Sequence, residues 1–268
     1  MDFGLHGKVA AVAASTSGLG LAVATELALE GAHVFIGSRG ESQPVEETVR
    51  AIRARLPEGA RNEVAGVKCD FSDPAQAEAF VAAATERFGR VDVLVANNGG
   101  PAPGPAEGVD VSTWEAGFRQ TFLSSQRLAE VAIAGMKERS WGRILFITST
   151  SVKQPIAGLA VSTAMRSAVV GYAKTLSDEL APFGITVNTV APGSILTPRL
   201  ESLLTKRAND ASTSFEDAKD ALEATIPTSR VGSPEEFAAA VTFLASSRAS
   251  YITGTVLQVD GGLVRSLT

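Results

Sequence analysis

The stretch that most constrains this chain is residues 8–31, KVAAVAASTSGLGLAVATELALEG. It opens with an apolar run, 9–14, that is too short for a surface helix and is typical of a strand buried on both faces. Small residues follow at 15–20, and then apolar residues recur at helical spacing up to Gly31. This order of strand, turn and helix brings unpaired backbone N–H groups and the positive end of a helix to one point. We therefore predict a phosphate-binding turn.

Two glycines in this turn, Gly18 and Gly20, let the backbone approach a ligand closely, because a Cβ at either position would intrude. The turn is poor in glycine, so a tight strand–helix connection without a ligand is the alternative interpretation. Its position favours a ligand, since dinucleotides bind at the first such turn of an α/β chain.

A second strand is predicted at 33–37, and it ends at Ser38 and Arg39. An acidic residue at this place binds the ribose hydroxyls of the adenosine, whereas an arginine accommodates a 2′-phosphate. Arg39 therefore favours NADP over NAD as the cofactor. A solvated loop arginine is the alternative.

The rest of the chain alternates predicted strands with predicted helices of ten or more residues. The strands are 64–69, 91–96, 144–148 and 186–191, and the helices are 44–56, 74–88, 113–137 and 162–180. Asp73 with Pro74 starts the helix that Gly89 ends, and Ser112 with Glu115 forms a capping box. This alternation predicts a single-domain α/β fold with a doubly wound parallel sheet.

Ligands of such a sheet bind where its strands end. Small or polar residues occupy the predicted strand ends, namely Ser15, Ser38, Asp70, Asn97, Ser149 and the pair Pro192-Gly193. The sequence therefore predicts one cleft along this edge of the sheet.

Composition excludes several other classes. A chain of 268 residues with a net charge of −5 is poorly suited to nucleic acid or an anionic membrane as a partner. Cys69 is the only cysteine, so an internal disulfide is impossible. No apolar run approaches the roughly 18 residues of a membrane span, and no signal peptide is recognisable. We expect a cytoplasmic protein without a metal site.

Several longer motifs point to one family. They are the turn at 15–20, Asp70, Asn97-Asn98-Gly99, the helix headed by Trp114, Ile147-Thr148-Ser149, and the runs 187–193 and 251–262. With these motifs nearly the whole chain resembles the short-chain dehydrogenase/reductase family. The resemblance implies one Rossmann-fold domain over 1–268 that forms a tetramer, or at least a dimer, through the helices at 113–137 and 162–180. The segment 199–228 is longer than a turn requires, which predicts a helical substrate lid.

The resemblance also implies which residues hold the cofactor. Asp70 and Phe71 would face the adenine, Asn97 and Gly99 the ribose and diphosphate, and Pro192, Gly193 and Thr197 the nicotinamide. The full predicted set is Ser15, Ser17, Gly18, Leu19, Gly20, Ser38, Arg39, Asp70, Phe71, Asn97, Gly99, Arg166, Pro192, Gly193, Ile195 and Thr197.

The chain departs from the family pattern where catalysis is expected. The first turn glycine of the family falls at Ala14, and its helix asparagine falls at Thr121. The family's catalytic Tyr-x-x-x-Lys begins thirteen residues after its serine, and counting from Ser149 this places Ser162 and Arg166 there. A serine hydroxyl can hydrogen-bond a carbonyl but is a poor acid, and an arginine stays protonated.

Of two residues near the missing tyrosine, Tyr172 is no replacement and Lys153 is the candidate. Tyr172 lies nearly three turns further along the same helix, so we predict a core position for it. Lys153 follows Ser149 by four residues and could donate a proton if it were partly desolvated. A solvated loop lysine is the alternative. The predicted catalytic set is Ser149, Lys153, Ser162 and Arg166.

Two functions remain open from the sequence. The first is an NADP(H)-dependent oxidoreductase that acts on a carbonyl or alcohol substrate through an atypical site, similar to 3-oxoacyl-[acyl-carrier-protein] reductases. The second is a catalytically silent NADP(H)-binding protein that serves as a sensor or structural partner. A turnover assay with bound cofactor separates them.

Overall fold

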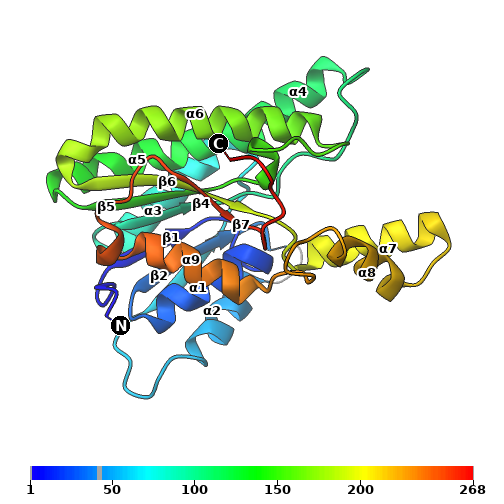
Figure 1. Ribbon diagram of the computed structural model, residues 1–268. Coiled ribbons are helices and arrows are strands. Elements are labelled where there is room, and N and C mark those ends of the chain that lie inside the picture. Colours follow the sequence, from blue (N-terminus) through cyan, green and yellow to red (C-terminus); the bar gives the residue numbers. More distant parts are fainter. Residues whose placement is uncertain (1, 41–43, 268) are drawn as a thin grey trace.

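The apolar runs of the sequence form the strands of one parallel sheet, as the computed structural model shows for residues 2–40 and 44–267 (Figure 1). The strand order is β3-β2-β1-β4-β5-β6-β7, and every neighbouring pair is parallel. The bounds are β1 Val9–Val12, β2 His33–Ser38, β3 Val64–Lys68, β4 Val93–Ala96, β5 Gly142–Ile147, β6 Ile185–Pro192 and β7 Val256–Val259. Because the order reverses between β1 and β4, their carboxyl ends open a crevice for a ligand.

Helices cover both faces of the sheet (Figure 1). One layer consists of α1 (Gly18–Leu29), α2 (Val45–Arg53) and α9 (Pro234–Ala245). The opposite layer consists of α3 (Pro74–Phe88), α5 (Ser124–Glu138) and α6 (Ala160–Leu180). The predicted doubly wound α/β fold is confirmed.

The remaining helices lie around the carboxyl edge of the sheet. α4 (Val111–Gly117) leads into a π-helical segment, η1 (Phe118–Leu123), while α7 (Pro198–Ala211) and α8 (Phe215–Glu223) project together from the body (Figure 1). Three short 3-10 turns complete the elements, η2 (Thr150–Val152), η3 (Ala181–Phe183) and η4 (Ser247–Ala249). None of the helices in the described part of the chain is long and apolar enough to cross a membrane.

The six predicted strands and the predicted helices are all present, with ends shifted by a few residues. The capping box at Ser112 and Glu115 is wrong. Asp110 is the N-cap instead, and its carboxylate accepts a hydrogen bond from the backbone N–H of Thr113 at 2.8 Å. The predicted helix at 113–137 is also not one regular α-helix, because η1 separates α4 from α5. β7 and α9 were not predicted.

The turn after β1 is tightly packed against α1. A Cβ on Gly20 would lie 2.2 Å from the carbonyl oxygen of Ala14, so only glycine fits there. Ala14 itself has a φ of 49°, in the left-handed region that disfavours residues with a Cβ. The family's glycine is therefore missing at a position where the backbone requires its conformation.

Replacing Ala14 with glycine is expected to raise the free energy of unfolding by about 1 kcal/mol. Glycine adopts the left-handed conformation without the strain that a Cβ causes, and this gain exceeds the cost of glycine's greater conformational entropy in the unfolded chain. Urea denaturation measures the change. Ala13→Gly is the matched control, since Ala13 is fully buried and lacks a positive φ, and it should destabilise the chain. An Ala14→Gly variant less stable than the parent would contradict the argument.

A buried carboxylate fixes the opposite, amino-terminal edge of the sheet. Asp92 is fully buried just before β4, and it accepts hydrogen bonds from the backbone N–H of Val9 at 3.0 Å and from Nε of Arg90 at 2.9 Å. Nε of Arg139 lies 3.6 Å from the same carboxylate. Asp92 therefore ties β1 to the start of β4 and to the end of α5.

Candidate active site and cofactor cleft

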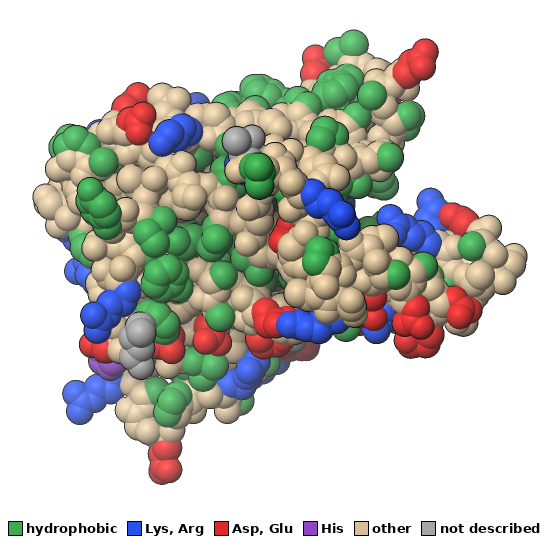
Figure 2. All heavy atoms as spheres, viewed as in Figure 1, with side chains coloured by type: hydrophobic (Ala, Val, Ile, Leu, Met, Phe, Trp, Pro, Cys, Tyr) green, Lys and Arg blue, Asp and Glu red, His purple; other side chains and the backbone are tan. Residues whose placement is uncertain are grey.

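Two adjoining cavities of about 390 and 230 Å³ lie at the carboxyl edge of the sheet. Both are lined by Ala14, Ser17, Asn98 and Gly99, so they form one elongated cleft that crosses the switch between β1 and β4. Figure 2 shows the surface hollowed between the region of α4 and the projecting α7–α8 pair. The shape suits a ligand with two separated parts.

The cleft brings together most of the predicted cofactor residues. The larger cavity is lined by Ser17, Gly18, Leu19, Asn97, Gly99, Arg166, Pro192, Gly193, Ile195 and Thr197. The smaller cavity is lined by Ser38, Arg39, Asp70 and Phe71, together with Ser17 and Gly99.

Two predicted cofactor residues, Ser15 and Gly20, do not line either cavity. The buried Ser15 hydroxyl donates to the carbonyl of Val12 at 2.6 Å and accepts from the N–H of Gly37 at 3.1 Å. Ser15 therefore joins the ends of β1 and β2, and Gly20 permits the close packing of α1.

The smaller cavity is lined by a positively charged residue, Arg39, and a negatively charged one, Asp70. Burial raises the pKa of Asp70, but hydrogen bonds from Ser72 and the charge of Arg39 outweigh this and leave the pKa below its usual value. Asp70 also accepts from the Ser72 hydroxyl at 2.8 Å. Arg39 is exposed at the cavity, within reach of solvent and of a ligand phosphate.

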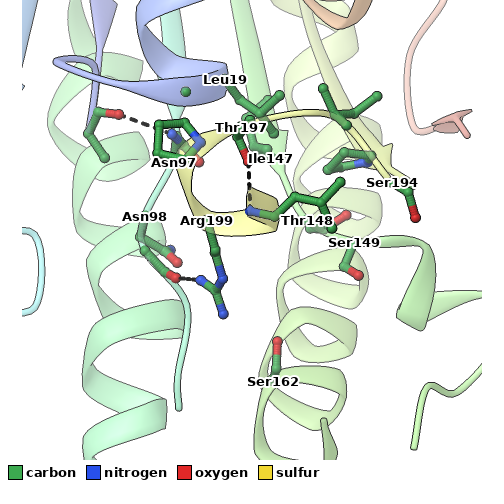
Figure 3. Close-up of a pocket in the computed structure, with 18 of the residues that line it drawn as sticks. Leu19, Asn97, Asn98, Ile147, Thr148, Ser149, Ser162, Ser194, Thr197 and Arg199 are labelled. Atoms are coloured by element: carbon green, nitrogen blue, oxygen red, sulfur yellow. Dashed lines mark hydrogen bonds between the residues drawn. The ribbon is translucent and has the colours of Figure 1, made fainter. Parts of the chain in front are cut away.

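Two serine hydroxyls face the larger cavity from adjacent segments (Figure 3). Ser149 follows β5 and caps η2, and its Oγ accepts a hydrogen bond from the N–H of Ser151 at 3.1 Å. Ser162 lies in the first turn of α6, and its Oγ accepts from Nε of Arg166 at 3.2 Å. Because each oxygen already accepts a bond from the protein, each hydroxyl proton can be donated to a ligand.

Arg166 is held rigidly beneath these serines. It is buried, and its Nη1 donates to the carbonyl oxygens of Ile147 and Thr148, both at 2.9 Å. Burial, with a smaller contribution from the charge of Arg199, lowers the pKa of Arg166 to about 10. The guanidinium therefore remains protonated at neutral pH.

The structure does not bring Lys153 to the lining of the cleft. Lys153 ends the η2 turn, is half-buried, and lines neither cavity. Tyr172 packs in the apolar layer, with its ring centroid 5.9 Å from that of Phe146, and burial raises its pKa to about 12. The core position predicted for Tyr172 is what the structure shows, while a catalytic part for Lys153 stays a prediction.

Sequence reasoning missed Arg199, which follows Thr197 and Pro198 at the start of α7. Nη1 of Arg199 reaches across the cleft and donates to the carbonyl oxygen of Gly99 (Figure 3). No local motif marks this arginine, because its partner lies 100 residues earlier in the chain. The larger cavity is also lined by residues that were not predicted as part of the site, including Asn98, Leu159, Ser194, Leu200 and Leu203.

The lining of the larger cavity has an unusual chemical composition. Among the described residues, it contains two arginines and several hydroxyl and amide groups, but no Asp, Glu, His, Cys, Tyr or Lys. It can therefore donate hydrogen bonds and hold negative charge, but no lining side chain is an acid or base that titrates near neutral pH.

Comparisons with known proteins agree with this architecture. A family model described as enoyl-(acyl carrier protein) reductase matches residues 13–264. The chain is 35% identical over 259 residues to the 3-oxoacyl-[acyl-carrier-protein] reductase of Vibrio cholerae, covering 97% of this chain and 98% of that relative. The chain therefore belongs to the short-chain dehydrogenase/reductase family.

Solved structures show the same fold over the whole chain. An actinorhodin polyketide ketoreductase crystallised with NADPH has a TM-score of 0.89 and 36% identity, covering 97% of this chain and 98% of that chain. The L-sorbose reductase of Gluconobacter frateurii, complexed with NADPH and L-sorbose, has a TM-score of 0.93 and 30% identity, with complete coverage of both chains. Both of these structures are of reductases, and both hold NADPH.

Proposed function

We propose that this protein is an NADPH-dependent reductase of a carbonyl substrate. One observation carries the proposal: Ser149 and Ser162 each accept a hydrogen bond from the protein and line the same cavity, so each hydroxyl can donate its proton to a ligand there. Two such donors can stabilise the negative charge that develops on a carbonyl oxygen during reduction. The reductases among the relatives support the same reaction class.

The residues of the cleft fit the cofactor. The start of α1, where Gly18 lines the larger cavity, gives a place for the diphosphate, while Arg39 in the smaller cavity suits a 2′-phosphate. Arg166 lines the larger cavity, which is where the nicotinamide end of the cofactor would lie. When bound, NADPH supplies the hydride.

The protein residues then have distinct parts. Ser149 and Ser162 bind the carbonyl oxygen, and Arg166, through its Nε bond to Ser162, keeps that hydroxyl oriented as a donor. The positive charge of Arg166 adds to the stabilisation of the oxyanion. The proton comes from Lys153 or from water, because the lining of the larger cavity holds no suitable acid.

The proposal is tested by binding followed by turnover. NADPH should bind, which its fluorescence reports, and should be oxidised when a panel of ketones and oxo esters is added. Tight binding without oxidation by any carbonyl, alcohol or enone substrate would support the silent NADP(H)-binding protein instead.

Exchanging Arg39 for aspartate is expected to reverse the cofactor preference. Loss of one charge-assisted contact to the 2′-phosphate should weaken NADPH binding by about 1–3 kcal/mol, while the new carboxylate can accept from the ribose hydroxyls of NADH. Dissociation constants for both cofactors measure this. Arg55→Asp is a control far from the cleft lining, and equal affinities of the unaltered protein for NADPH and NADH would refute the assignment.

We also propose a homotetramer, or at least a dimer, in the cytoplasm, with α7 and α8 as the substrate lid. Exposed small residues follow one face of α6 at Ala164, Ala168 and Gly171, and the stacked rings of Phe118 and Phe122 lie next to this helix. Small side chains allow two helices to approach closely. Light scattering should give at least twice the 27.7 kDa mass of the chain, and a monomer at micromolar concentration would contradict the assembly.

A further inference from the structure

Two guanidinium groups meet in the larger cavity beside Gly100. A Cβ built on Gly100 would lie 2.8 Å from Nη2 of Arg166 and 3.4 Å from Nη1 of Arg199. Because both distances start from the same point, the two nitrogens are at most the sum of these distances apart. They come from opposite sides of the cleft, one from α6 and the other from the start of α7.

Their positive charge is not neutralised by the protein. The lining of this cavity has no acidic residue, and within residues 2–40 and 44–267 neither arginine forms an ion pair with a carboxylate. Arg143, which is also buried, differs because its guanidinium lies over the Trp141 ring, 4.4 Å from the ring centroid. Arg199 is exposed, so water screens part of its charge, but the two like charges still repel and an anion bound between them would relieve the repulsion.

One nitrogen of Arg166 is free for that anion. Nη1 and Nε are occupied by the carbonyls of Ile147 and Thr148 and by Ser162, whereas Nη2 has no hydrogen-bond partner among the described residues. Arg166 is more than nine-tenths buried, and Nη2 is the nitrogen of its side chain that lies nearest a Cβ built on Gly100. Arg199 also has Nε and Nη2 without a partner in the described chain.

We infer that Arg166 and Arg199 bind an anionic group of the substrate, a carboxylate placed one or two carbons from the reacting carbonyl. The inference rests on the proposed reductase function. Nε of Arg166 holds Ser162, a proposed carbonyl donor, and Nη2 lies on the same edge of the planar group. A 2-oxo or 3-oxo acid can therefore place its carbonyl at Ser162 and its carboxylate at Nη2.

The phosphates of the cofactor are the competing source of negative charge. The start of α1 already offers unpaired N–H groups to a diphosphate, and the smaller cavity offers Arg39 to a 2′-phosphate. Arg166 is anchored instead to the end of β5, next to the two serines. The observations therefore favour the substrate.

The test compares acids with their neutral esters in a binding measurement. Acetoacetate and pyruvate, each paired with its methyl ester, are titrated calorimetrically into the protein saturated with NADP⁺, which cannot reduce them, and NADPH affinity is measured separately by fluorescence. Each acid should bind at least tenfold more tightly than its ester. Arg199→Gln should remove this preference without changing ester affinity, and Arg199→Lys should retain part of it.

Arg207→Gln is the matched control, because Arg207 is exposed on the same helix and lies outside the cavity lining. Equal affinity for acid and ester, or no binding of either, would overturn the inference. An acid preference that survives Arg199→Gln while NADPH affinity falls tenfold would assign the arginine to the cofactor and also overturn it. An acid preference without NADPH oxidation would uphold the inference while the proposed reductase activity fails.

Discussion

Removing the hydroxyl of Ser162 is expected to lower kcat by about 10²–10³-fold, the loss typical of one donor to a developing oxyanion. Ser162→Ala takes away a hydroxyl that lines the larger cavity and accepts from Nε of Arg166. NADPH affinity should stay within about twofold, because the lost bond is made to the substrate in the transition state. Steady-state kinetics with fluorescence titration separates the two quantities.

Ser167→Ala is the control for this variant, since Ser167 is exposed on the same helix. Ser162→Thr, which keeps a hydroxyl, should recover part of the activity. A Ser162→Ala protein with unchanged kcat would remove Ser162 from the mechanism. In the same assay, a loss of about 10²-fold on Lys153→Ala would assign the proton to Lys153, and unchanged turnover would assign it to water.

Removing the carboxylate of Asp92 should lower the free energy of unfolding by about 3 kcal/mol. Asp92→Ala leaves the backbone N–H of Val9 buried without an acceptor, and it leaves Arg90 and Arg139 without their shared counter-charge. The two arginines are partly exposed and can be hydrated, so the unsatisfied N–H accounts for much of the loss. Chemical denaturation at neutral pH measures it.

The control is an ion pair on the surface. Asp178 lies 3.9 Å from Lys174 and both side chains are largely exposed, so Asp178→Ala should change stability by less than about 0.5 kcal/mol. Asp92→Asn should be intermediate, because its amide oxygen can still accept from Val9. An Asp92→Ala variant as stable as the parent would show that the amino-terminal edge of the sheet is held by other contacts.

Much of the fold could be predicted because burial on both faces leaves a clear pattern. β1, β4 and β5 consist entirely of buried residues, and these apolar runs are visible in the sequence. β7 was not predicted as a strand because it lies at the edge of the sheet and its residues are only half-buried. Its residues were instead assigned to a longer family motif. The π-helical segment η1 was not predicted because its residues are equally compatible with an α-helix.

The residues of the candidate site likewise include some that could be predicted from the sequence and some that could not. Residues at strand ends, such as Asp70, Asn97 and Ser149, could be predicted because the topology of a parallel sheet brings those ends to one edge. Arg199 could not, because its position in the site depends on a contact across the cleft to Gly99. The hydrogen bonds of Ser15 could not be predicted either, since a small polar residue in such a turn can bind a ligand or, as its hydroxyl does here, the backbone.

The contact between Arg199 and Gly99 has a kinetic consequence. Gly99 lines both cavities, so this bridge from the start of α7 crosses the junction that a dinucleotide must span. We expect the bridge to open when the cofactor enters, so that the released guanidinium can then meet an acidic substrate. The two ligands should therefore bind in a compulsory order with the dinucleotide first, and the oxidised dinucleotide should leave last.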